Sequence, residues 1–304
     1  MICVVLVNYN GKEYNQACID SILKSTCGSQ IQIVVVDNAS TDGSVGELER
    51  LYADSGSIHL ICLDQNYGFS RANNEGIRWA LGKHCQYIIL LNNDTEIEPW
   101  AIEKMIELQK RTGHIIVPKI LYAGQRDRIW CAGGELSGIL KKAKHRGAGE
   151  TDRGQFDRED RCNFANGCCM LLTGRIVEKL GVLDERFFLY YEDTEYSMRA
   201  GKNGIGISYC GQAVVYHKVN GSTGGNQNPS NVYYITRNWL MCNQMYMKLR
   251  FVLFCFYFML NRVCWAFIWI LQGRPDMVKA MWAGIKDFKN RKSGKYEDTI
   301  SNVD

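Results

Sequence analysis

Short clusters of small polar residues follow four apolar runs in the first third of the chain. The carboxyl ends of parallel strands meet at one edge of a sheet, so runs that form such strands would bring the clusters into one ligand site. Capping of the next helix accounts for any single cluster, and for residues 42–44 we favour that interpretation. Capping does not call for the carboxylates of Asp37 and Asp94, which stand beyond two of the runs. The clusters are NYNG at 8–11, DNASTDGS at 37–44, DQNYG at 64–68 and NNDT at 92–95.

The ligand can be narrowed by the residues at these positions. No GxGxxG follows the first run and no GxxxxGK[ST] occurs in the sequence, so a dinucleotide or P-loop site would lack its phosphate cradle. Asp37 can accept hydrogen bonds from a nucleotide base or a ribose. Asp94, close to Asn92, is a hard oxygen ligand suited to Mg²⁺ or Mn²⁺ held between protein and phosphates. The clusters therefore predict a nucleoside diphosphate bound with a divalent cation.

The composition indicates a folded chain with an unevenly placed charge. The 304 residues are 46% hydrophobic and 22% charged, which argues against disorder. The net charge is +4, and residues 272–296 alone hold seven Lys or Arg against two Asp. The remainder is close to neutral, which argues against nucleic acid as a partner and for a C-terminal segment facing an anionic surface. Thirteen Cys without a CxxC pair, and no signal-like segment at the start, predict reduced thiols in the cytosol.

Hydrophobic periodicity predicts a parallel α/β sheet in the first half and a mixed region after it. Residues 141–161 are polar, and we expect an exposed, mobile loop there. The expected strands of the first half are Ile2–Val7, Ile31–Val36, Ile58–Leu63 and Tyr87–Leu91, with helices at about 12–26, 44–54, 70–82 and 99–111. Farther on we expect strands at Ile115–Val117, Ile129–Ala132, Gly167–Leu172, Ile205–Ser208 and Ala213–Tyr216, a hairpin at 133–138 and a helix at 192–202.

Residues 251–271 form an apolar segment long enough to cross a bilayer. Asn261 and Arg262 stand at its centre, where an Arg costs about 2.5–3.5 kcal/mol on insertion scales. Basic residues flank both ends, as expected when a segment enters and leaves the membrane on one face. We favour two helices broken near Asn261 and Arg262 that lie in the membrane surface. A spanning helix and a buried core or oligomer helix remain alternatives.

Five motifs, in this order and spacing, resemble the family 2 inverting glycosyltransferases over about residues 2–245. The likeness is strongest to bacterial enzymes of cell-surface polysaccharide assembly, many of them called rhamnosyltransferases. The motifs are VVLVNYNG at the start, VVVDNASTDGS at 34–44, LDQNYGFSRANNEGI at 63–77, LLNNDTEIEP at 90–99 and FFLYYEDTEYSMRAGKNG at 187–204.

The resemblance implies a GT-A fold, an α/β architecture with a Rossmann-like, mostly parallel central sheet flanked by helices. The catalytic domain would cover 1–230, with a nucleotide-sugar half at about 1–112 and an acceptor half at about 113–230. Residues 231–304 would form a helical, basic, membrane-associating region. The family's DxD motif aligns with Asn92-Asn93-Asp94, so Asp94 is the only carboxylate left for the metal. The nucleotide-binding residues implied are Asn8, Asn10, Asp37, Asn66, Gly68, Arg71, Asn74 and Asn92.

The same resemblance implies that Asp193 removes the proton of the acceptor hydroxyl, with Glu192 beside it at the start of a helix. An acidic first helical turn is the ordinary alternative explanation of this pair. His217, after the last predicted strand, would complete the metal shell, or else be an ordinary packed histidine. The Gly- and Ser-rich segment 220–225 would close over the nucleotide. Acceptor contacts are assigned to Asn166, Gly167 and Tyr191. Tyr191 belongs to the aromatic run 187–191, of which Phe187 and Phe188 could equally pack in the core.

Together these features predict an inverting glycosyltransferase that moves a sugar from a nucleoside-diphosphate sugar to a lipid-linked or oligosaccharide acceptor. The donor sugar is not readable, and rhamnose is the choice that the family branch suggests. We expect a peripheral or monotopic protein on the cytoplasmic face of the membrane, and a homo-oligomer is compatible with the sequence. The alternatives are a sugar-1-phosphate nucleotidyltransferase and a non-catalytic scaffold of a polysaccharide-assembly complex that uses residues 231–304 as its contact surface.

Overall fold

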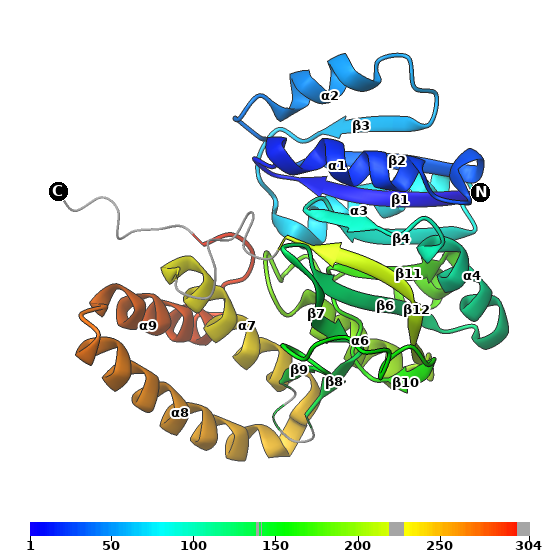
Figure 1. Ribbon diagram of the computed structural model, residues 1–304. Coiled ribbons are helices and arrows are strands. Elements are labelled where there is room, and N and C mark those ends of the chain that lie inside the picture. Colours follow the sequence, from blue (N-terminus) through cyan, green and yellow to red (C-terminus); the bar gives the residue numbers. More distant parts are fainter. Residues whose placement is uncertain (138–139, 141, 219–227, 297–304) are drawn as a thin grey trace.

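The computed structural model describes residues 1–137, 140, 142–218 and 228–296, and the predicted closing segment 220–225 lies outside them. A mixed β-sheet with helices on both faces forms the body of the protein (Figure 1). The sheet order is β10-β12-β6-β11-β4-β1-β2-β3, with β5 paired to β12 and β7 to β6. The strands are β1 (Ile2–Asn8), β2 (Ile31–Asp37), β3 (Ile58–Cys62), β4 (Tyr87–Asn92), β5 (Thr95–Ile97), β6 (Ile115–Tyr122), β7 (Gln125–Ala132), β10 (Asp160–Cys162), β11 (Cys169–Thr173) and β12 (Ile207–His217), and β8 (Gly134–Leu136) pairs with β9 (Ala143–His145) apart from this sheet.

The first four strands are parallel, as their continuous apolar runs predict. Alternate residues of β1 enter different cores: Val4 packs on one face of the sheet and Val5 on the other. Both side chains are fully buried. Because the strands are parallel and in register, Asn8 stands beside Asp37, and their polar ends share one edge of the sheet.

Helices cover each face of the sheet according to their apolar stripes. One face packs against α1 (Lys12–Leu23), α2 (Ser44–Tyr52) and α4 (Ala101–Thr112), and the other against α3 (Gly68–Gly82), α5 (Gly174–Leu180) and α6 (Glu192–Lys202). Helix α3 lies very close to β1 at Gly76. A Cβ on this glycine would stand 2.2 Å from a methyl carbon of Val5. The four helices expected in the first half are therefore present, with small shifts at their ends.

The second half of the sheet differs from the prediction in two places. The expected strands Ile205–Ser208 and Ala213–Tyr216 are one strand, β12, whose register against β6 shifts between Cys210 and Val214. Residues 142–161, within the segment expected to be a loop, contain β9 and the first residues of β10. The buried ammonium of Lys119 lies 2.7 Å from Asp152 and 2.5 Å from Asp157, and these two contacts fasten the polar segment to the sheet.

Three helices at the C-terminal end form a separate apolar cluster beside the sheet: α7 (Pro229–Met247), α8 (Phe251–Leu271) and α9 (Pro275–Lys289). A short turn, Lys248–Arg250, joins the first two. Figure 1 shows α7 next to the body of the protein and α8 along the outer edge of the three-helix group. In the described part of the chain, the stretch Pro229–Leu271 has the length and apolar composition needed to cross a membrane.

The predicted break near Asn261 and Arg262 is wrong, because α8 is continuous from Phe251 to Leu271. The Arg262 side chain points towards α7, where its Nη1 lies 3.4 Å from Oγ1 of Thr236. Its guanidinium also lies over the rings of Trp239 and Phe258. These contacts stabilise the charged guanidinium of Arg262 inside the helix group, so the backbone hydrogen bonds of α8 continue without a break.

Candidate active site

The ends of β1 and β2 are joined by a buried polar network. The side-chain amide of Asn8 donates to Oδ1 of Asp37 at 2.7 Å and to the Ser44 hydroxyl at 2.8 Å. Oδ2 of Asp37 accepts from the backbone amide of Ser40 at 2.9 Å. Asn10, in the left-handed region at φ 52°, accepts from the Thr41 amide at 2.8 Å. The structure thus brings the first two predicted clusters together. It also fixes Asp37 at the edge of the sheet where the carboxyl ends of the parallel strands meet, which we call the rim.

The third cluster is bound partly to its neighbours and partly to the loop before α6. The Oδ1 of Asn66 accepts from Asn38 and from the amide of Gly68, each at 2.9 Å. Gly68 has φ +85°, and a Cβ there would stand 2.3 Å from the carbonyl oxygen of Phe188. Arg71 stacks over the Tyr67 ring at 3.6 Å from its centroid. Gly68 is needed for this close approach of two chain segments.

Asn74, which the resemblance assigned to nucleotide binding, has protein partners for its side-chain nitrogen and oxygen. Its amide nitrogen donates to the Leu183 carbonyl and to Glu185, and its oxygen accepts from the Leu183 amide, all at 2.9 Å. The side chain is fully buried. Asn74 therefore joins α3 to the segment before α6, and we do not carry its nucleotide-binding assignment forward.

The three residues of the NND triplet, Asn92, Asn93 and Asp94, lie in different surroundings. Asn92 ends β4, and its backbone amide donates to the Cys168 carbonyl at 2.9 Å. Asn93 lies inside the protein and donates to Asn8 at 3.2 Å and to Asn15 at 2.8 Å. Sequence reasoning missed Asn93 and Asn15, and their only signal was the number of Asn residues around the first and fourth clusters. Asp94 is left facing the last strand.

Pairing of β5 with β12 brings Asp94 and His217 together. Thr95 stands opposite His217 in the antiparallel register, and Asp94 precedes it. Oδ1 of Asp94 lies 3.2 Å from Nε2 of His217. Both side chains are at least nine-tenths buried, yet among the described residues Oδ1 of Asp94 and Nδ1 of His217 form no hydrogen bond. Buried polar atoms without partners are expected at a site that awaits a ligand.

These two side chains suit a divalent cation that a bound diphosphate helps to hold. A carboxylate oxygen and an imidazole nitrogen are accepted by Mn²⁺, and the carboxylate also by Mg²⁺. The described ranges contain no group of three or more His, Cys, Asp or Glu arranged to hold a metal. An ion at Asp94 and His217 would therefore need further ligands of another kind, such as the phosphate groups or water that complete the shell in nucleotide sites.

Glu192 and Asp193 open α6 directly after two residues in the left-handed region, Tyr190 at φ 65° and Tyr191 at φ 74°. Oδ2 of Asp193 accepts from the Gly167 amide at 3.1 Å, and Oδ1 accepts from the Thr194 amide at 2.6 Å. The predicted acceptor residue Gly167 is thus in contact with the predicted base. Tyr191 caps the same helix, half-buried among aromatic residues of the C-terminal cluster.

The two carboxyl groups differ in how the protein treats their charge. Burial, and then the neighbouring Asp193, raise the pKa of Glu192 well above its ordinary value of 4.5. One oxygen of Glu192 is buried and has no hydrogen-bond partner in the part of the chain that the structure describes. Burial also raises the pKa of Asp193, but the amides of Gly167 and Thr194 oppose this by stabilising its charged form. We therefore infer that Glu192 holds the proton of the pair and Asp193 is the available base.

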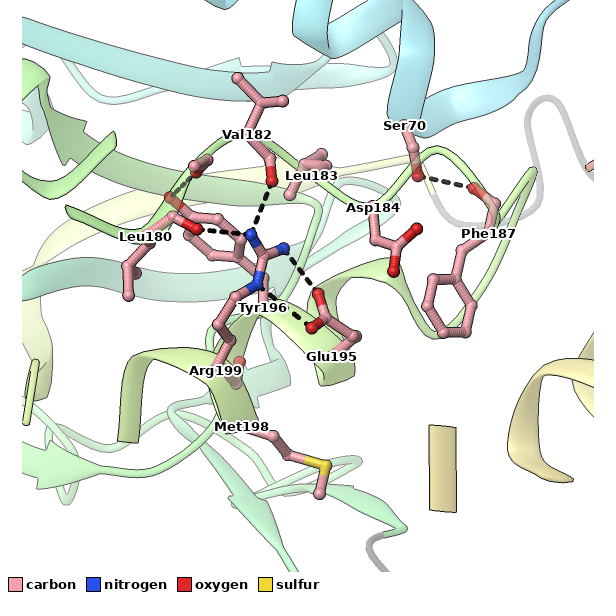
Figure 2. A network of polar contacts seen from close by, with 12 residues as sticks. Ser70, Leu180, Val182, Leu183, Asp184, Phe187, Glu195, Tyr196, Met198 and Arg199 are labelled. Carbon is pink, nitrogen blue, oxygen red and sulfur yellow. Dashed lines mark hydrogen bonds and ion pairs between the residues drawn. The ribbon is translucent and has the colours of Figure 1, made fainter. Parts of the chain in front are cut away.

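Helix α6 is held from two sides, so Asp193 has a fixed position. Nη1 of Arg199 donates to the carbonyls of Leu180 at 2.7 Å and Val182 at 2.9 Å (Figure 2). Its Nη2 donates to Glu195 at 2.6 Å. The Tyr246 hydroxyl of α7 donates to the same Glu195 at 2.7 Å. The carboxylate of Glu195 thus connects the end of α5, through Arg199, with helix α7.

An aromatic wall adjoins the predicted acceptor residue Asn166. The Asn166 amide is 3.0 Å from Nε2 of His145, whose ring lies 4.4 Å from that of Trp130. The ring centroid of His217 is 4.8 Å from that of Trp130. Burial, and then His217, lower the pKa of His145, so it is neutral at pH 7. Sequence reasoning missed His145 because it lies in a segment read as a loop.

Comparison with known proteins decides the family. The sequence model of glycosyl transferase family 2 matches residues 3–181, which includes β1 to β11 and the Asp94 loop. The chain belongs to glycosyl transferase family 2. The glycosyltransferase is 30% identical over 213 residues to the low-salt glycan biosynthesis hexosyltransferase of Haloferax volcanii, and the match covers 69% of this chain and 64% of that protein.

Two further relatives carry rhamnosyltransferase names. A dTDP-rhamnosyl transferase of Shigella flexneri is 26% identical, with 72% of this chain and 69% of that protein covered. The N-acetylglucosaminyl-diphospho-decaprenol L-rhamnosyltransferase of Mycobacterium tuberculosis is 23% identical, with 73% and 77% covered. These similarities place the glycosyltransferase in the rhamnosyltransferase-like branch, as its motifs predicted.

Solved structures confirm the predicted GT-A fold. The crystal structure of GalNAc-T7 with UDP, GalNAc and Mn²⁺ superposes with a TM-score of 0.60 at 18% identity, covering 77% of this chain and 47% of that one. Staphylococcus aureus TarS 1-349 in complex with UDP gives a TM-score of 0.55 at 16% identity, covering 80% and 65%. At these identities the comparison concerns the fold of the glycosyltransferase alone.

Proposed function

We propose that the protein is an inverting glycosyltransferase that moves a sugar, rhamnose as first choice, from a nucleoside-diphosphate sugar to a lipid-linked saccharide. The observation that carries the proposal is a chain of contacts at the ends of two neighbouring strands. Asp193 binds Gly167, the next residue Cys168 binds Asn92, and Asp94 follows two positions later. The candidate base and the candidate metal ligand therefore share one rim.

In this proposal the donor lies along the ends of β1, β2 and β4. Asp37 and Asn8 contact the nucleoside, with Asn10, Asn66, Arg71 and Asn92 around them. Asp94 and His217 hold Mg²⁺ or Mn²⁺, and the bound ion supplies positive charge that offsets the charge of the leaving nucleoside diphosphate. Fixed side chains at this rim also orient the sugar for attack.

Transfer then takes place in one displacement. Asp193 takes the proton of the acceptor hydroxyl as the hydroxyl oxygen forms its bond to the anomeric carbon. The bond from that carbon to the diphosphate oxygen breaks on the opposite face, so the configuration inverts. With Glu192 protonated, Asp193 is the anionic member of this pair. Asn166, His145 and Trp130 form the wall on which the acceptor saccharide rests, aromatic rings being suited to sugar faces.

The lipid-linked acceptor is supported by the outer helix. The face of α8 turned away from α7 is apolar over its whole length, with Leu253 73% exposed, Phe256 70% and Phe267 62%. Basic residues stand at both ends of α8, Arg250 on one side and Arg274 on the other. A continuous apolar face with basic flanks suits a helix that lies in the headgroup region of an anionic leaflet. We place this face on the cytoplasmic side.

A direct assay tests the proposal. Purified protein is given dTDP-rhamnose and a panel of UDP- and GDP-sugars, with polyprenyl-diphosphate N-acetylglucosamine as acceptor and Mn²⁺ or EDTA present. The proposal expects release of a nucleoside diphosphate that depends on both acceptor and Mn²⁺, with a product of inverted anomeric configuration. Release of pyrophosphate would point to nucleotidyl transfer instead. A panel without any turnover, from protein that binds no nucleotide, would favour a non-catalytic role.

A further inference from the structure

The turn before α6 has a conformation that its own residues do not favour. Tyr190 and Tyr191 are consecutive non-glycine residues with positive φ, at 65° and 74°. L-residues visit this region at a cost, and they stay there only where the surrounding structure holds them. The direction in which Asp193 leaves the start of α6 depends on this turn. Something outside the turn must therefore stabilise it.

Asn238 of α7 provides that support. Its side-chain amide donates to the carbonyls of Leu189 at 2.9 Å and Tyr190 at 2.8 Å. Its oxygen accepts from Nε of Arg237 at 3.0 Å, which fixes the orientation of the amide. The side chain is fully buried. Both donors of Asn238 are thus spent on the turn, and neither contributes to its own helix.

Arg237 continues the connection to the C-terminal helices. Its Nη1 donates to the Gly294 carbonyl at 2.8 Å and to the Tyr233 hydroxyl at 3.2 Å. The Tyr233 hydroxyl in turn donates to Asp287 of α9 at 2.8 Å. Helices α7 and α9 therefore form one hydrogen-bonded unit with the turn, and α8, with its exposed apolar face, packs on the same unit.

We propose that Asn238 is a positioning residue for sugar transfer, which holds the Tyr190 and Tyr191 turn so that Asp193 faces the acceptor hydroxyl. The inference rests on the proposed function, in which Asp193 is the base. It adds that the C-terminal helix group, whose α8 faces the lipid, also sets the orientation of the catalytic carboxylate through Asn238 of α7. The base and the membrane-facing surface are then placed relative to each other by one side chain.

Asn243 offers a matched control on the same helix. It is also a fully buried asparagine, but its amide donates only to the Trp239 carbonyl of its own helix, at 2.8 Å. Asn238→Ala and Asn243→Ala therefore make the same change of side chain at the same depth. Only the first removes hydrogen bonds to the turn.

The variants are compared by steady-state kinetics, with the donor and acceptor that give turnover in the panel above, and by amide hydrogen exchange. Asn238→Ala should lower kcat on the order of 100-fold, the scale of a misplacement of about 1 Å, with donor KM little changed. Amide exchange within 187–193 should rise. Asn243→Ala should show neither effect. If Asn238→Ala does not fold, Asn238→Gln, which keeps both donors on a longer chain, should fold with an intermediate kcat.

Equal loss of kcat in both alanine variants, or unchanged exchange within 187–193, would overturn the inference. Asp193→Asn is measured alongside to separate the two proposals. If Asp193→Asn abolishes turnover and Asn238→Ala does not lower it, the positioning role falls and the proposed function stands. If Asp193→Asn keeps normal turnover, the proposed function falls and the positioning of a base falls with it.

Discussion

Nε2 of His217 lies 3.2 Å from Oδ1 of Asp94, although one residue ends the last strand of the sheet and the other follows β4. The pairing of β5 with β12 creates this contact. Among the described residues, this buried Oδ1 forms no hydrogen bond of good geometry, and Nε2 of His217 is its near neighbour. A cation bound with phosphate oxygens would give the Asp94 oxygen a partner beside Nε2 of His217.

Asp94→Asn and His217→Gln should weaken Mn²⁺-dependent binding of a nucleoside diphosphate. We expect a loss on the order of 10- to 100-fold for each, the range in which changes around a metal site fall. Calorimetric titration of UDP and dTDP, with Mn²⁺ and with EDTA, measures the effect. His59→Gln, a histidine on β3 that bonds Gln32 at 2.8 Å, is the control and should bind normally. Equal binding in EDTA and Mn²⁺ would remove the metal role.

Asp193→Asn should keep donor binding and lower kcat by about 10²- to 10⁴-fold, the usual contribution of a general base. An amide cannot take the acceptor proton, but its oxygen can still accept from the Gly167 amide, so the fold of the rim is preserved. Acceptor-dependent nucleoside diphosphate release measures kcat, and nucleotide titration measures binding. Asp54→Asn, an exposed change after α2, is the control. A kcat close to that of the parent protein would exclude Asp193 as the base.

The raised pKa of Glu192 makes a prediction about stability and pH. Its pKa is raised in the folded protein, so the folded state binds more protons than the unfolded state above about pH 4.5. The free energy of unfolding should therefore fall as pH rises from 4.5 towards the raised pKa, by at most about 1.4 kcal/mol per pH unit for one proton. Glu192→Gln should flatten this slope. Urea unfolding between about pH 5 and 8 measures this slope, and identical slopes would contradict a buried protonated Glu192.

The sequence predicted the nucleotide half better than the acceptor half, for physical reasons. Strands buried on both faces are read directly from continuous apolar runs, and parallel pairing then brings Asp37 and Asp94 to one edge. The direction of a side chain on a helix is not readable in this way. Arg262 was expected to break α8, but it points at Thr236 and Trp239 of α7.

Contacts between distant segments explain the remaining differences. Asn74 belongs to a motif that resembles a nucleotide site, yet its partners are Leu183 and Glu185, more than a hundred positions later. Asn238 binds the Leu189 and Tyr190 carbonyls from a helix in which no motif was recognised. A local pattern carries no information on such partners, so these roles needed the folded structure.

Gly68→Ala tests the close approach between α3 and the segment before α6. The new Cβ would meet the Phe188 carbonyl oxygen at 2.3 Å in a backbone conformation with φ +85°. Left-handed strain and overpacking together should cost roughly 2–6 kcal/mol of stability. Gly46→Ala, in α2, meets no atom within 4 Å and should be neutral or slightly stabilising. Thermal unfolding compares the two, and equal midpoints would show that the chain moves apart there at little cost.

The apolar face of α8 predicts how the protein binds lipid. Burying Leu253 and Phe256 in a bilayer surface should contribute roughly 1.5–3 kcal/mol each, and nearby Lys or Arg about 1 kcal/mol each on anionic lipid. The double variant Leu253→Glu and Phe256→Glu should therefore bind phosphatidylglycerol vesicles at least about 100-fold more weakly. Leu23→Glu, an exposed leucine of α1, should bind normally. Vesicle sedimentation at low and high salt measures binding. Unchanged sedimentation of the double variant, together with a change from dimer to monomer in gel filtration, would instead show that a second copy of the protein covers α8. In that case the new charges would break a protein contact and leave lipid binding intact.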